Sequence, residues 1–423
     1  MILQRARTTL IPWLLGFVLV LNFPVIGGLE QAPRVTDVVG AVLGIWLLLK
    51  LSLIGVDVRP FFTLLTLSVI PLLWGLEAFF EGDISTIVLS IRWLLAIPWG
   101  YALFFISRTP QRTALVWGLW WGCVANVVVL ALQHLGYGEA LIDVGLVVPD
   151  TFSGGYVDTQ YRAPGLHGHP NASAAVVSLI VPLSLYLYFA RRARIWVVIV
   201  GLGVLLATTQ LTLTRSSLLV GLLTLVTALM VYRNTKRSLR LALILVYMGL
   251  PLIIWFGPPG GWERWSDPEN LQPNLSERIG TSTAALEVSL EHPMGLGVAE
   301  GRAELEQTTG LDTSHNAYLQ TAVQYGLPFA AVLVLLTLAL PLRMLTLPSH
   351  VLVAAKPEWM LEAMLAVLLF GVFWFEEHLN SAVFVMLTAW IAATAVARGT
   401  LVPEQSGAKH VTPASRHSYY QAS

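Results

Sequence analysis

Charged residues are scarce in this sequence. Only 12% of its 423 residues are Asp, Glu, Lys or Arg, whereas 56% are hydrophobic and the mean hydropathy is +0.69. Because ordinary soluble domains carry roughly 25% charged residues, this composition excludes that class and indicates an integral membrane protein. The single cysteine, Cys123, excludes an intrachain disulfide and a thiolate metal cluster.

Several nucleotide and metal motifs are also missing. The sequence contains no P-loop, no zinc-ligand spacing and no Asp-x-Asp pair of the kind that holds a divalent ion on a nucleotide sugar. These absences disfavour a metal-dependent transferase with a soluble donor. We therefore expect neither a cofactor nor a metal ion.

Apolar runs long enough to cross about 30 Å of hydrocarbon recur along the chain. Since backbone groups in lipid must be satisfied internally, they predict an all-α polytopic membrane protein with about twelve transmembrane helices. The first run reads as a retained anchor, not a cleaved signal peptide. The expected spans lie near 9–28, 35–55, 60–80, 84–106, 113–134, 171–190, 195–212, 216–232, 241–257, 318–342, 358–375 and 380–398.

Lysine and arginine set the expected orientation. With a cytoplasmic N-terminus, most of the 25 basic residues fall on the inside, which places both termini in the cytoplasm. The external loops then hold only Arg34, Arg162, Arg264, Arg278 and Arg302.

These spans divide the chain into four parts. Residues 1–257 would hold helices one to nine, with a smaller external loop at about 136–170, and 258–316 would form a large external loop before the tenth helix. Within it, "SERIGTSTAALEVSLEH" predicts an amphipathic helix beginning near Asn274 or Ser276. Helices ten to twelve would follow in 317–398, and a polar cytoplasmic tail in 399–423.

Three arginines near the external side are candidates for binding an anion. The large loop is acidic, so a general anion-attracting surface is excluded, and we expect no nucleic-acid partner. Arg215 lies between two apolar runs and Arg278 in the amphipathic segment, where a planar guanidinium suits bidentate phosphate contacts. Arg92 lies about 12 Å into its helix. It needs either Glu77 as an ion-pair partner or a lipid-linked phosphate. Snorkelling of Arg215 and surface pairing of Arg278 with Glu277 or Glu287 remain open.

His315 is the candidate general base. In "DTSHNAYLQ", Thr313 or Ser314 is expected to cap a helix, which puts His315 in the first turn, where the helix dipole should lower its pKa. A neutral imidazole there can accept the proton of a sugar hydroxyl. A histidine that only caps the loop is the alternative.

The segment "RAPGLHGHPNASA" gathers further polar residues at a helix start. Arg162 and His169 are candidates for substrate binding there, whereas the His167–His169 pair lacks a third metal ligand. The turn "WFEEHLNS", with Glu376 and Glu377, could orient a base, but a solvated turn is the favoured interpretation.

At these residues the sequence resembles the O-antigen ligase family. The family's Arg-x3-Leu pattern is matched by Arg215 through Leu219. Its His-[Asn/Ser/Gln]-x9-Gly pattern is matched by His315, Asn316 and Gly326, although Phe329 departs from the final position. Arg278 fits the family's loop arginine. The similarity covers about 160–340.

The resemblance implies a metal-independent, inverting glycosyltransferase of the Gram-negative inner membrane with a periplasmic site. Its expected partners are a glycan donor on undecaprenyl pyrophosphate, a lipid A core acceptor and membrane lipids. His315 would be the base, and Arg215, Arg278, Arg92, Asn316, Arg162 and His169 would bind substrate.

Three alternatives remain open. An O-antigen polymerase or a protein O-oligosaccharyltransferase would share this donor site but use another acceptor. A transporter of the lipid-linked glycan belongs to a different class, and should show charged residues at mid-membrane and broken helices. The sequence leaves the oligomeric state undetermined.

Overall fold

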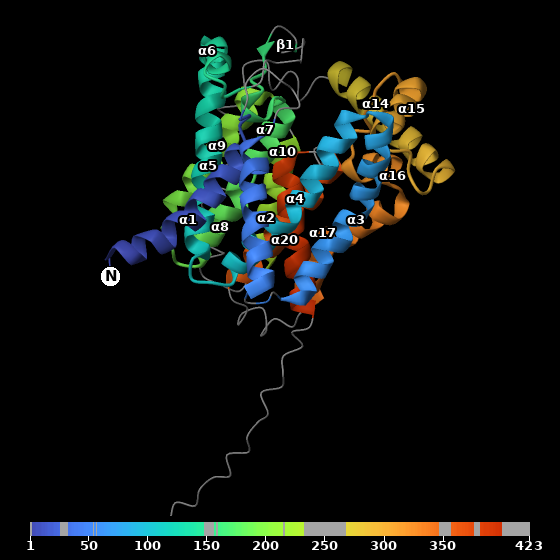
Figure 1. The fold of residues 1–423 in the computed structure, drawn as a ribbon. Coiled ribbons are helices and arrows are strands. Elements are labelled where there is room, and N and C mark those ends of the chain that lie inside the picture. The colour runs from blue at the N-terminus through green and yellow to red at the C-terminus, as the bar shows by residue number, and fades with distance from the viewer. Residues whose placement is uncertain are drawn as a thin grey trace, which may run out of the picture.

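The structure is a computed structural model, and it describes residues 2–25, 33–53, 55, 57–147, 156–157, 160–214, 216–231, 268–346, 357–375 and 381–399. Within these ranges the expected all-α class is confirmed (Figure 1). The exception is a two-stranded antiparallel hairpin, in which β1 (Tyr156–Val157) pairs with β2 (Gln160–Tyr161).

The first half of the described chain is a series of long helices joined mostly by short turns. They are α1 (Ile2–Leu21), α2 (Val35–Leu53), α3 (Val58–Glu81), α4 (Ile84–Ser107), α5 (Arg112–Leu132), η1 (Gln133–Tyr137), α6 (Gly138–Asp143), η2 (Gly165–His167), α7 (Pro170–Val177), α8 (Ile180–Phe189), α9 (Trp196–Thr212) and α10 (Ser216–Val231). The later helices are α14 (Pro268–Glu291), α15 (Val298–Thr309), α16 (Ala317–Tyr325), α17 (Leu327–Thr346), α19 (Pro357–Phe375) and α20 (Ala382–Gly399).

Five of the described helical segments are long and apolar enough to cross a membrane. They are Val35–Leu53, Val58–Phe80, Thr86–Ser107, Arg112–Asp143 and Pro170–Phe189. Several shorter apolar helices pack with them, so the chain is a multi-pass membrane protein. The expected span at 241–257 and the tail at 399–423 lie outside the described residues, apart from residue 399.

Two expected boundaries are wrong. The span predicted at 318–342 is two helices, α16 and α17, because Gly326 adopts φ 92° and interrupts the ladder. The amphipathic helix α14 begins at Pro268, and the same loop contains a second helix, α15, that no motif predicted. The helix that contains α5 and η1 kinks at Gly136 (φ 93°), where the loop at about 136–170 was expected to begin, and the short helix α6 follows this kink.

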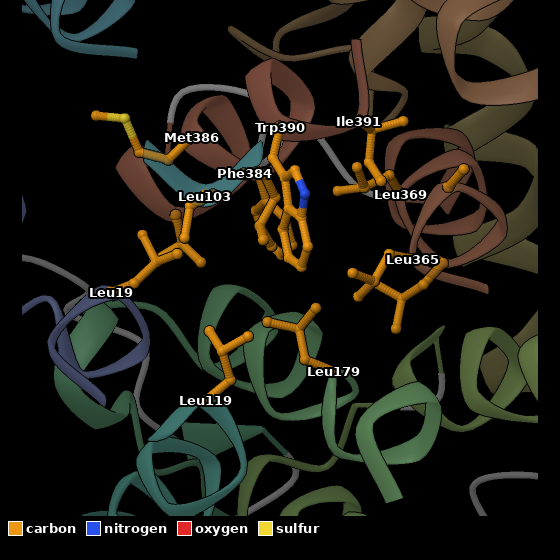
Figure 2. Close-up of a cluster of buried hydrophobic side chains, with 14 of the residues drawn as sticks. Leu19, Leu103, Leu119, Leu179, Leu365, Leu369, Phe384, Met386, Trp390 and Ile391 are labelled. Carbon is orange, nitrogen blue, oxygen red and sulfur yellow. The ribbon is translucent and has the colours of Figure 1, made fainter. Parts of the chain in front are cut away.

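The core lies where α20 meets the other bundle helices. Trp390 is fully buried among side chains from segments far apart in sequence (Figure 2). These include Leu179, directly before α8, and Leu365 of α19. This packing orders α20 in the bundle centre. Its first residue, Ala382, and the preceding Ser381 line the cavity described below.

Helices α1 and α5 pack backbone to backbone through glycines. A methyl group at Gly118 would overlap the carbonyl oxygen of Trp13, and one at Gly16 would overlap that of Leu115. Small residues allow this approach, which supplies van der Waals contact where lipid provides no hydrophobic driving force.

We therefore predict that Gly118→Leu destabilises the protein, while Gly203→Leu does not. A side chain at Gly118 must push α1 away from α5, at a cost of about 1–3 kcal/mol or more. Gly203 on α9 has open space at its Cβ position. Thermal unfolding of the detergent-purified variants measures the difference, and equal melting temperatures for both would contradict the packing.

Candidate functional site

A polar cavity of about 280 Å³ lies at one end of the helical bundle. Its walls come from the end of α1, the starts of α2, α7 and α20, the interior of α4, and helices α15 and α16. The lining residues are Asn22, Arg34, Arg92, His167, His169, Ala172, Arg302, Gln320, Ser381 and Ala382. Three arginine side chains therefore line one cavity.

Arg34 fastens this end of the bundle together. Its Nη1 donates to the carbonyl oxygens of Asn22 (3.0 Å) and Leu166 (3.3 Å), which joins α1, α2 and the segment before α7. Its backbone N–H donates to Asp37 Oδ2 at 2.9 Å. Burial, with Arg92 acting in the same direction and Asp37 opposing, lowers the pKa of Arg34 to about 10, so the group stays protonated at neutral pH.

Arg92 pairs with Asp37 of α2, and the expected pairing with Glu77 is not the one found. The Arg92 Nε–Asp37 Oδ1 distance is 3.8 Å, too long for a hydrogen bond. Both atoms are buried without a hydrogen-bond partner. A buried guanidinium in this state is only partly compensated, and it would gain from an anion in the cavity.

The cavity residues carry buried hydrogen-bonding groups that lack a partner, and most of these groups are donors. Arg92 Nε, Arg302 Nε and Gln320 Nε2 are all buried and lack a partner. Among the described residues, the cavity lining contains three arginines and no Asp or Glu, and Asp37 lies beside Arg92. The electrostatics therefore favour an anion with several acceptor oxygens and disfavour a metal cation.

His315 stands just outside a helix, not in its first turn. The cap of α16 is Asn316, whose Oδ1 accepts from the backbone N–H groups of Tyr318 (3.0 Å) and Leu319 (3.1 Å). The expected capping by Thr313 or Ser314 is thus wrong, and so is the premise that the first-turn dipole acts on His315. His315 instead takes the left-handed region at φ 53°, an uncommon conformation that histidine tolerates better than most residues.

A carboxylate stands beside the imidazole. His315 Nε2 lies 3.8 Å from Glu277 Oε1 on α14, and the two side chains are 29% and 48% exposed. A base flanked by a carboxylate is stabilised in the protonated form it acquires on accepting a proton. Sequence analysis considered Glu277 only as a partner of Arg278, because a contact across 38 positions leaves no local pattern.

The loop carrying His315 is held from several sides. Asn316 Nδ2 donates to the carbonyl oxygen of Trp374 at 3.3 Å, which ties it to the end of α19. Ser314 accepts at its carbonyl oxygen from Ser282 Oγ (3.4 Å) on α14, and its backbone N–H donates to Gln320 Oε1 (2.9 Å). His315 is not among the residues that line the cavity. Gln320, which does line the cavity, is hydrogen-bonded to the loop that carries His315.

Gly326, the glycine of the His-Asn-x9-Gly motif, occupies a position where a side chain would not fit. A side chain at Gly326 would meet the backbone of Pro293 and Met294. The Leu327 N–H donates to the Pro293 carbonyl at 2.9 Å, so residues 293–297 fill the break between α16 and α17. Phe329, which departs from the family pattern, is buried and packs edge-on against Trp93 with ring centroids 5.5 Å apart.

Arg162 and His169, which both precede α7, differ in their position relative to the cavity. Arg162 donates through Nη2 to Asn171 Oδ1 (2.7 Å) and through Nε to the Thr212 carbonyl (2.8 Å), so it anchors the end of α9 and is not a cavity residue. His169 does line the cavity. It caps α7 by accepting from the Asn171 N–H at Nδ1, 3.2 Å away.

The remaining candidates lie apart from the cavity or outside the described residues. Arg278 is half-buried on α14, and its carbonyl accepts from Thr281 Oγ1 at 3.3 Å. Arg215, Glu376 and Glu377 are not among the described residues.

Two cavity arginines were missed as candidates. Sequence analysis placed Arg34 and Arg302 in external loops without a role, since neither belongs to a motif. The available signal was their rarity, because only five basic residues fall in the external loops and two of these meet Arg92 in space.

Comparison with known proteins gives one result for part of the chain. No curated protein matches it. Residues 200–335, which include Arg302, His315 and Gln320, match the model of a family described as O-antigen ligase. This match supports the assignment of the chain to the O-antigen ligase family.

Proposed function

We propose that the protein transfers a glycan from undecaprenyl pyrophosphate to a sugar hydroxyl of lipid A core. The observation that carries the proposal is the cavity in which Arg34, Arg92 and Arg302 meet. A diphosphate offers the charge and the acceptor oxygens that these donors lack. The match of residues 200–335 to the O-antigen ligase family supports the same reaction class.

The reaction is a single displacement at the anomeric carbon. The acceptor hydroxyl oxygen forms the new bond to this carbon as its proton passes to His315. The bond from the anomeric carbon to the diphosphate oxygen breaks, and its electron pair leaves with undecaprenyl pyrophosphate. The arginines stabilise the charge that develops on the leaving group, and Glu277 stabilises the imidazolium. Such a displacement inverts the configuration and needs neither metal nor cofactor.

The proposal retains Arg215, Arg278, Asn316 and His169 as substrate-binding residues around this centre. Arg162 acts indirectly, because it holds Thr212 and Thr214, which lie close before Arg215 in the chain. The donor's lipid would extend from the cavity into the membrane.

The proposed topology has about twelve transmembrane helices in the Gram-negative inner membrane, with both termini cytoplasmic. The cavity and α14–α16 then face the periplasm. The four parts are residues 1–257, with a loop at about 136–170, the large loop 258–316, helices in 317–398 and a tail in 399–423. The placement of the ends of α1, α2, α7, α16 and α20 around one cavity supports this alternation.

The competing functions differ in acceptor or in bond formation. A polymerase would extend the donor glycan, and a protein O-oligosaccharyltransferase would modify a polypeptide. A glycan transporter is compatible with the helix break at Gly326, so transport has to be distinguished by chemistry.

An assay with purified protein, lipid-linked glycan and lipid A core tests the proposal directly. We expect glycan attached to lipid A core, with undecaprenyl pyrophosphate released in equal amount and activity kept in the presence of a chelator. A product lengthened on the donor would establish the polymerase instead. Loss of turnover on chelation would exclude the metal-free mechanism.

We predict that His315→Ala abolishes transfer but largely preserves donor binding. Removal of a general base costs about 10²–10⁴-fold in rate, whereas the cavity residues remain in place. Turnover and donor affinity should be measured on the same preparation. Arg215→Ala is expected to weaken both quantities, and a His315→Ala variant with near-normal turnover would refute the assigned role.

We predict that Arg302→Gln weakens binding of the lipid-linked donor about tenfold or more. A hydrogen bond to a charged group contributes about 1.5–3 kcal/mol, and 1.4 kcal/mol is a factor of ten in affinity. Arg108→Gln is the control, since Arg108 is 41% exposed, pairs with Asp57 at 3.9 Å and lies at the opposite end of α4. Comparable losses in the two variants would show that overall charge, and not the cavity, determines binding.

A further inference from the structure

The side-chain amide of Gln320 has a hydrogen-bond partner at its oxygen but none at its nitrogen. Gln320 lies on α16, one turn after the cap, and is 4% exposed. Its Oε1 accepts from the Ser314 backbone N–H at 2.9 Å, whereas its Nε2 is buried without a hydrogen-bond partner, and the residue lines the cavity. A buried amide that keeps two donors unmet destabilises the protein unless a ligand accepts from them.

The orientation of this amide is determined by its partner. If the oxygen and nitrogen exchanged places, Nε2 would face the Ser314 N–H, and two donors cannot bond. The nitrogen therefore faces away from the loop. The same side chain contacts the loop that carries His315 and lines the cavity that holds the three arginines.

Ser314 is well placed to pass on a change at Gln320. Its Oγ donates to the Asn316 carbonyl at 2.8 Å, so hydrogen bonds span His315 from both sides. His315 itself holds the left-handed backbone conformation at φ 53°. A shift of the Gln320 amide would therefore move Ser314, the residue directly before the proposed base His315.

We propose that Gln320 is a positioning residue that couples diphosphate binding in the cavity to the placement of His315. Its Nε2 donates to a phosphate oxygen of the donor while its Oε1 keeps the Ser314 N–H. The loop is then held most firmly when the leaving group is in place. The inference rests on the proposed function, because it takes the diphosphate as the ligand of the cavity.

Gln324 provides a matched control. It lies one helical turn later on α16, is 1% exposed, and also has a buried Nε2 without a partner. It is absent from the cavity lining. The two positions share the same helix and a similar burial, but of the two only Gln320 bridges the cavity and the loop.

The experiment uses the full-length protein in nanodiscs, with inorganic pyrophosphate as the probe. Amide hydrogen exchange of residues 312–316 is measured with and without saturating pyrophosphate for wild type, Gln320→Met and Gln324→Met. We expect pyrophosphate to slow exchange at least fivefold in wild type and Gln324→Met, and less than twofold in Gln320→Met. In the transfer assay, Gln320→Met should lower kcat about tenfold or more with a smaller change in KM.

Gln320→Glu keeps the proposal testable if the methionine variant folds poorly. Its carboxylate can still accept from Ser314 while the second oxygen faces the arginines, so its melting temperature should equal or exceed that of wild type. Its pyrophosphate affinity should fall at least tenfold, because the added charge occupies the anion's place.

The outcomes separate the two ideas. Pyrophosphate that binds and still protects the loop in Gln320→Met overturns the coupling role but leaves the proposed function standing. A wild-type protein that does not bind pyrophosphate overturns the proposed cavity function, and this inference with it.

Discussion

Three arginines line one cavity whose described lining contains no Asp or Glu, and much of the site's organisation follows from this charge imbalance. In the low-dielectric interior such charges repel each other and are poorly solvated. They persist because rigid elements hold them. Arg34 is bonded to the carbonyls of Asn22 and Leu166, and Arg92 is fixed within α4. A bound anion would reduce the repulsion between these arginines.

The proposed base, His315, and the arginine-lined cavity are built from different parts of the chain. Arg34 and Arg92 belong to the first four helices, whereas Arg302, His315 and Gln320 belong to α15, α16 and the loop between them. The Trp374 carbonyl fastens Asn316 to α19 on one side, and Ser282 fastens Ser314 to α14 on the other. The proposed transfer would require this kind of fixed relation between the cavity and His315.

The sequence predicted the positions of several apolar helices closely, since hydropathy reports burial in lipid directly. Spans such as 35–55 and 195–212 end within two residues of α2 and α9. It failed where tertiary contacts decide. The break at Gly326 depends on Pro293, and the partner of Arg92 is Asp37, 55 positions away. His169 and Arg92 were predicted as site residues and do line the cavity, but Arg34 and Arg302 carry no motif.

The break at Gly326 also determines where the chain can tolerate length changes. The Leu296 and Gly297 N–H groups donate to the carbonyls of Val323 and Gln324, both at 2.9 Å, so residues 293–297 and α16 form one block. An inserted residue between Pro293 and Asn316 would shift this block against α19 and displace the imidazole. The spacing between Pro293 and α16 is therefore set by backbone hydrogen bonds, so natural selection should conserve the length of this segment.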